Sequence, residues 1–228
     1  MSMEHLIRLE LKKTPVRNYI LFSVLAIVLG MFFLLASLTD SSDTVHDFDN
    51  AFRSAEMIFS FIFIVFFAVL NGALVISEYN NRTILLMFTY PVNKKKLIAA
   101  KLLLITLFIA ISLGIGYVCC SLFLVWIDRK FDLLADTFSG AVLEYFVVRS
   151  LTTIVVFSCL GLWTFAAGML RKSVTVTIIS SLFFIFLRQL IIASCKEPRE
   201  SPVMVLGVLM ITAAALWYAF KKTVTELD

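Results

Sequence analysis

Six long runs of apolar residues constrain this chain more than any other feature. They cover residues 19–38, 57–76, 102–124, 151–170, 174–194 and 203–220. A helix needs about 20 mostly apolar residues to cross the hydrocarbon core of a bilayer. The runs are apolar on every face, whereas the strands of a membrane barrel would alternate over shorter segments. We therefore expect an all-α integral membrane protein with six transmembrane helices.

The composition excludes an ordinary soluble domain. Of the 228 residues, 61% are hydrophobic and 16% are charged, whereas soluble domains are roughly half apolar. The net charge of +4 is too small to indicate nucleic-acid binding. The first residues lack a short apolar core followed by a small-residue cleavage site, so we expect the first apolar run to remain in the mature protein.

The distribution of basic residues predicts the orientation of the helices. Thirteen of the 20 Lys and Arg residues lie before the first run, after the second, after the fourth and after the sixth. Loops that are rich in Lys and Arg face the cytoplasm. An even number of runs places both termini on the same side, so we expect both termini to be cytoplasmic.

The apolar runs lack the residue types that chemistry within a membrane requires. No Asp, Glu or His lies within the runs as drawn, which argues against an intramembrane enzyme, a metal site and a proton relay. The chain also lacks the GxxxxGK[ST] phosphate-binding loop, so we expect no nucleotide cofactor in this chain. A transporter of this composition would need a separate ATPase.

The fifth run carries a stripe of polar residues. Thr177, Ser181 and Arg188 project within about 40° of one another on a helix. Arg188 is the one charged residue in the runs, and its long side chain is able to reach outward to the membrane surface. The stripe has two interpretations: it lines a transport pathway, or it forms hydrogen bonds between helices.

The loop between the second and third runs, residues 77–101, is the only sizeable loop on the predicted cytoplasmic side. After Glu78 it contains an apolar segment, residues 84–88, then Tyr90, Pro91 and three consecutive lysines. Because proline disfavours the helical conformation in the preceding residue, we expect a short helix that ends before Pro91. Such a helix would bury its apolar side chains against lipid headgroups or against a cytoplasmic partner protein.

The order of residues in this loop resembles that of type-2 ABC exporter permeases. It runs from Glu through Arg-Thr, an apolar stretch, Phe-x-Tyr-Pro and a basic cluster to a Lys that opens the next run. The similarity is greatest to short bacterial permeases of the bacitracin and lantibiotic resistance or immunity group. Residues 1–18 also resemble the amphipathic connecting helix of that family, followed by a six-span domain at 19–228.

The resemblance implies the mechanism of an ABC exporter subunit in the bacterial plasma membrane. The loop would form a coupling helix seated on a separate ATP-binding subunit, which would bind ATP and Mg. A second permease copy or a related permease would complete the transporter, and its substrate would be an amphipathic peptide, such as a peptide antibiotic, lantibiotic or toxin. The coupling contact is assigned to Glu78, Tyr79, Arg82, Thr83, Leu86, Phe88, Tyr90 and Pro91.

Two other functions compete with a permease that has no catalytic activity of its own. The first is a membrane scaffold or sensor, in which the loop binds a regulatory protein rather than an ATPase. The second is an intramembrane enzyme with unfamiliar chemistry. Association with an ATPase through residues 82–90 would distinguish the permease from the scaffold, and turnover without nucleotide would reveal the enzyme.

Overall fold

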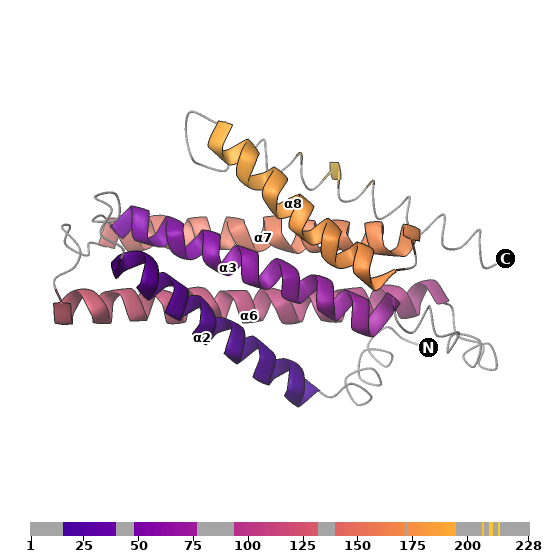
Figure 1. Cartoon of the computed structure of the whole chain (residues 1–228), viewed down its shortest axis with the longest axis horizontal. Helices are drawn as coiled ribbons and strands as arrows, with labels where there is room; N and C mark the ends of the chain where they lie inside the picture. The colour runs from indigo at the N-terminus through magenta and orange to yellow at the C-terminus, as the bar shows by residue number, and fades with distance from the viewer. Residues whose placement is uncertain are drawn as a thin grey trace. The chain divides into compact units, whose positions relative to one another are not determined.

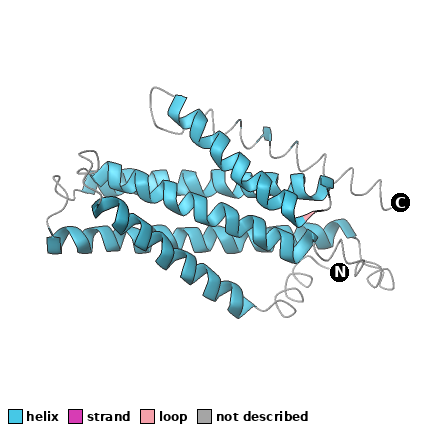
Figure 2. Cartoon of the chain, in the orientation of Figure 1, coloured by secondary structure: helices cyan, strands magenta, loops and turns pink. Residues whose placement is uncertain are grey.

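A computed structural model describes residues 16–39, 48–76, 94–131, 140–171 and 173–194, together with residues 207, 210, 211 and 214. The part of the chain that it describes is helical and contains no strand (Figure 2). This confirms the predicted all-α class for those residues. Residues 1–15, with most of the predicted connecting helix, lie outside the described part.

Five α-helices and one π-helix make up the described chain (Figure 1). They are α2 (Val16–Thr39), α3 (Phe48–Asn71), the π-helix η1 (Gly72–Ile76), α6 (Lys94–Phe131), α7 (Gly140–Arg171) and α8 (Val174–Ser194). The helices follow from long apolar sequences without proline, because an apolar segment that spans a membrane satisfies its backbone hydrogen bonds internally.

Four helical stretches are long and apolar enough to cross a membrane: Val16–Leu38, Phe48–Ile76, Ile98–Lys130 and Phe146–Arg171. Each contains most or all of one of the first four predicted runs. The fifth predicted run coincides with α8, although its apolar stretch, Val174–Gln189, is shorter than the other four. The sixth run lies almost entirely outside the described residues, so the count of six spans stays a prediction.

The second helix begins earlier than its apolar run suggested. The apolar run that predicts the second span starts at residue 57, whereas α3 begins at Phe48. Asp49 and Glu56 therefore lie within this helix, in the turns that precede the apolar run, and the run itself contains no acidic residue. The extension is helical because Phe48, Phe52 and Phe59 continue one buried face of α3 past the polar residues.

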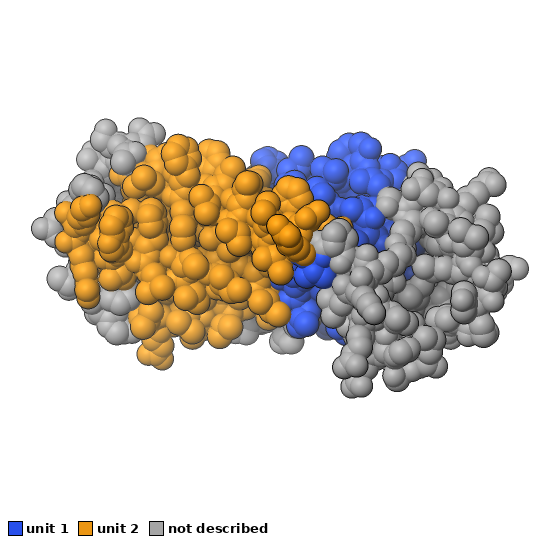
Figure 3. All heavy atoms as spheres, turned by 90° about the horizontal axis from the view of Figure 1, so that it is seen from below, with its two compact units in different colours: residues 1–16, 64–109, 156–228 blue, residues 17–63, 110–155 orange. Residues whose placement is uncertain are grey.

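The chain divides into two compact units, which Figure 3 colours separately. Unit 2 contains residues 17–63 and 110–155. In its interior the ring of Phe59 packs against two glycines. A Cβ atom added at Gly30 would lie 3.0 Å from this ring, and one added at Gly116 would lie 3.1 Å from it. Small residues let membrane helices approach closely, and these glycines make room for the aromatic ring.

Unit 1 contains residues 1–16, 64–109 and 156–228. Its described interior also depends on glycines that receive larger side chains. A Cβ at Gly161 would lie 2.5 Å from the ring of Phe67, and a Cβ at Gly168 would overlap the Thr177 hydroxyl and approach Ile76. Gly161 thus allows α3 to pack tightly against α7, and Gly168 does the same for η1 and α8.

The exterior of α6 is strongly apolar. Its exposed large side chains recur at every third or fourth position, and they are Leu103, Leu107, Ile111, Ile115, Val118, Leu122 and Trp126. Soluble monomers rarely expose an apolar surface of this length. The stripe therefore suits contact with lipid or with another apolar helix.

Candidate functional site

The loop predicted to bind a partner lies outside the described residues, but both of its attachments are described. This applies to all eight residues assigned to the coupling contact, Glu78, Tyr79, Arg82, Thr83, Leu86, Phe88, Tyr90 and Pro91. Before the loop, α3 continues into η1 and ends at Ile76; after it, α6 begins at Lys94. The contacts of η1 and of the first turns of α6 therefore define the two ends of the loop.

A lysine of α6 links the two attachments. Lys101 Nζ donates a hydrogen bond to the carbonyl oxygen of Leu74 in η1, at 3.2 Å, and only 6% of Lys101 is exposed. The carbonyl end of a helix carries a partial negative charge, so an ammonium group there is favourably placed. The sequence marks this lysine as the residue that opens the third run, but it carries no signal of a contact with η1.

η1 is also packed against the two other helices of unit 1. A Cβ at Gly72 would lie 2.6 Å from Val174 Cγ1, so the backbone of η1 lies against the start of α8. Just before η1, the Asn71 Nδ2 donates to the Gly161 carbonyl of α7 at 3.4 Å. The segment that leads into the predicted coupling loop therefore contacts α6, α7 and α8.

The polar stripe predicted on the fifth run lies on a buried face of α8. Thr177 and Ser181 have no exposed surface, and Arg188 is 4% exposed. Thr177 Oγ1 donates to the Ser173 carbonyl at 3.1 Å, and Ser181 Oγ donates to the Ile178 carbonyl at 2.7 Å. The two hydroxyls thus bond to their own helix, as such side chains often do in helices.

Arg188 of α8 contacts an aromatic ring of α7. Its guanidinium carbon lies 5.0 Å from the ring centroid of Phe157 on α7. Phe157 belongs to the candidate span Phe146–Arg171, so Arg188 packs against a neighbouring helix. A cation over an aromatic face gains about 2 kcal/mol when it is desolvated, which favours the buried position.

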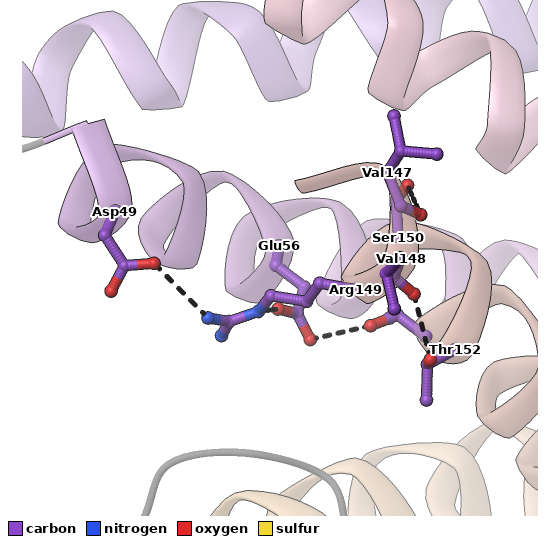
Figure 4. Close-up of polar contacts among 8 residues, drawn as sticks. Asp49, Glu56, Val147, Val148, Arg149, Ser150 and Thr152 are labelled. Carbon is purple, nitrogen blue, oxygen red and sulfur yellow. Dashed lines mark hydrogen bonds and ion pairs between the residues drawn. The ribbon is translucent and has the colours of Figure 1, made fainter. Parts of the chain in front are cut away.

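A charged cluster that the sequence analysis missed joins α3 and α7 in unit 2 (Figure 4). Arg149 Nε donates to Glu56 Oε2 at 2.5 Å, and Thr153 Oγ1 donates to Glu56 Oε1 at 3.0 Å. Asp49 Oδ1 lies 3.9 Å from Arg149 Nη1. Both carboxylate oxygens of Glu56 are engaged, as a buried charge requires.

The cluster lies next to packed aromatic rings. The ring of Phe52 on α3 stacks on the ring of Phe146 on α7, with the two centroids 4.0 Å apart. Each phenylalanine lies one helical turn before the charged residue of its own helix. The Tyr117 ring of α6 meets Phe146 edge-on at 6.1 Å. The Glu56 and Arg149 side chains are largely buried, and lower solvent access strengthens both the attraction of the pair and the cost of breaking it.

Chemically, the cluster can connect helices or bind a charged group, but it offers no metal site. In the described ranges, no three His, Cys, Asp or Glu residues are grouped as metal ligands. The signal for the cluster was present in the sequence: Glu56 is spaced four residues from Phe52 and three from Phe59, on the apolar face of a helix. A search for long apolar runs does not find the cluster, because Glu56 and Arg149 lie just before the runs that begin at residues 57 and 151.

Comparison with known proteins agrees with this architecture. Residues 6–188 match the family described as ABC-2 family transporter protein. The chain is also 34% identical, over 222 residues, to the uncharacterized protein YcbO of Bacillus subtilis strain 168, and the match covers 95% of each chain. The described residues include four helices long and apolar enough to cross a membrane, and this multi-pass membrane protein belongs to the ABC-2 transporter family.

Proposed function

We propose that this chain is the permease subunit of an ATP-driven ABC exporter. The observation that carries the proposal is the family match over residues 6–188 of a chain with four helices of spanning length. Members of this family typically work with an ATP-binding subunit. The chain itself has no phosphate-binding GxxxxGK[ST] sequence, so the energy comes from that partner.

The partner contact is the loop between η1 and α6. Its apolar residues, including Leu86 and Phe88, form a coupling helix that binds a groove of the ATP-binding subunit, and Glu78 and Tyr79 join that helix to α3. ATP acts by favouring one permease arrangement over another through these contacts. The proposal is supported by the loop's residue order and by the contact between Lys101 and Leu74, which holds the loop's attachments together.

The transporter contains two permeases with their termini in the cytoplasm. The excess of Lys and Arg on one set of loops supports this orientation. A second copy or a related permease supplies the other half of the pathway. The buried polar face of α8, with Thr177, Ser181 and Arg188, contributes to that pathway.

The substrate class is an amphipathic peptide, such as a peptide antibiotic, lantibiotic or toxin. The resemblance of the loop to permeases of the bacitracin and lantibiotic group supports this choice. It is tested with the transporter reconstituted in lipid nanodiscs, by measuring ATP hydrolysis with bacitracin or nisin added. Stimulation by either peptide supports the assignment, and stimulation by neither contradicts it.

The test of the proposed function is isolation of the tagged chain from its native membranes in mild detergent. We expect a P-loop ATPase to accompany it, and we expect Phe88→Ala to lose that ATPase while Trp126→Ala, a control at an exposed position of α6, retains it. A regulatory protein bound through residues 82–90 in place of an ATPase would favour a membrane scaffold or sensor instead.

A further inference from the structure

We infer that Lys101 is a positioning residue that joins the two ends of the coupling loop, through the Leu74 carbonyl, and makes α3 follow the movement of the loop. The inference rests on the proposed function, because it concerns how a partner's movement enters the membrane helices. It adds the residue and the contact that carry this movement.

Lys101 is an unusual residue for its position. It lies within the candidate span Ile98–Lys130 and is buried. Lysine side chains are almost never fully buried unless they are paired, so a buried lysine marks a specific contact. The described contact is the hydrogen bond of its ammonium group to Leu74, a residue 27 positions earlier on the other side of the loop. This hydrogen bond therefore joins the residues on the two sides of the loop.

The acceptor lies in a π-helix, which is also unusual. π-Helical turns are rare and occur often at functional sites. η1 stands between α3 and the loop in the chain, so it is the covalent route by which a movement of the loop reaches α3. The carbonyl of Leu74 lies near the end of η1, where the partial negative charge of the helix attracts the ammonium group.

η1 also packs closely against α7 and α8, in addition to its hydrogen bond with Lys101. Gly72 lies against Val174 of α8, and Ile76 lies against Gly168 of α7. Ile76 has no exposed surface. With Lys101 in place, η1 and the first turns of α6 move as one body. Without it, η1 loses its hydrogen bond to α6, and movement at the start of α6 passes to η1 less directly.

The first experiment needs no partner. The full chain in lipid nanodiscs is compared by hydrogen–deuterium exchange with Lys101→Met, Lys101→Arg and Lys130→Met. Lys130 is the matched control, because it is an exposed lysine near the other end of the same helix. We expect backbone exchange in residues 72–76 and 98–102 to rise about tenfold in Lys101→Met, since a hydrogen bond from a charged donor is lost. Lys101→Arg should restore slow exchange, and Lys130→Met should not alter it.

The second experiment uses the complex with the copurified ATPase, and its probe is ATP with orthovanadate. In the unaltered complex, trapped nucleotide should change exchange in α3. In Lys101→Met, the ATPase should remain bound and active, but the nucleotide-dependent change in α3 should be lost. A merely structural role of Lys101 would instead reduce ATPase binding, hydrolysis and the α3 response together.

The outcomes separate this inference from the proposed function. Unchanged exchange in residues 72–76 of Lys101→Met overturns the inference, whether or not an ATPase is found. A nucleotide response in α3 of Lys101→Met equal to that of the unaltered complex also overturns it. Absence of any ATPase contradicts the proposed function alone, because the partner-free experiment still reports on the Lys101 contact.

Discussion

The ion pair between Glu56 and Arg149 provides the sharpest test of the packing between α3 and α7. Only 10% of the Glu56 side chain and 18% of the Arg149 side chain are exposed. Removing one partner from a buried pair leaves the other charge uncompensated, which costs about 3–5 kcal/mol. We therefore expect Glu56→Ala to lower the free energy of unfolding by about that amount.

The neighbours of the pair should contribute less. Thr153→Val keeps the shape of the side chain but removes its hydrogen bond to Glu56, so we expect a loss of about 1.5–3 kcal/mol. Asp49 is half-exposed and 3.9 Å from Arg149. Its replacement by Asn should cost less than about 1 kcal/mol, because exposed ion pairs are weak.

The assay is SDS-induced unfolding in mixed micelles, followed by the fluorescence of the chain's three tryptophans. Glu56→Leu and Arg149→Met form a double-mutant cycle when they are made singly and combined in a double variant. The double variant removes both charges, so it should be less costly than either single substitution. A loss below about 1 kcal/mol for Glu56→Ala, or a double variant as costly as the sum of the singles, would refute a buried pair.

Three further predictions concern packing and the polar face of α8. Gly168→Ala should lower the free energy of unfolding by about 1–3 kcal/mol, because its Cβ overlaps Thr177, whereas Gly114→Ala should not lower it, because its Cβ meets only Ile154 at 3.8 Å. Phe59→Ala should cost about 3–5 kcal/mol and half-buried Phe66→Ala clearly less; equal losses would contradict the burial of Phe59. Arg188→Met should abolish peptide-stimulated ATP hydrolysis while ATPase binding persists, and unaltered stimulation would remove Arg188 from the pathway.

The existence of the helices could be predicted from sequence because a long apolar run has few other stable structures in a membrane. Their ends could not be predicted equally well. α3 begins at Phe48 rather than at residue 57, because its first turns alternate polar and apolar faces and fail a test of overall hydrophobicity. For the same reason the sequence did not predict that Glu56 lies in this helix.

Contacts between helices were less accessible to sequence reasoning than features of one helix. The stripe of Thr177, Ser181 and Arg188 follows from the helical period alone, and the structure confirms that these residues share a buried face. The direction of Arg188 depends on Phe157 of a neighbouring helix. The bond between Lys101 and Leu74 likewise depends on how two helices pack, which no local pattern specifies.

The most direct test of the account is photo-crosslinking from the loop in native membranes. A photoreactive amino acid at position 86 should form a covalent product with a P-loop ATPase, because Leu86 is assigned to the coupling contact. The same group at position 126, an exposed site on α6, should not. An adduct with lipid alone at position 86, or capture of the ATPase from position 126 instead, would contradict the claim that this loop receives the energy of ATP.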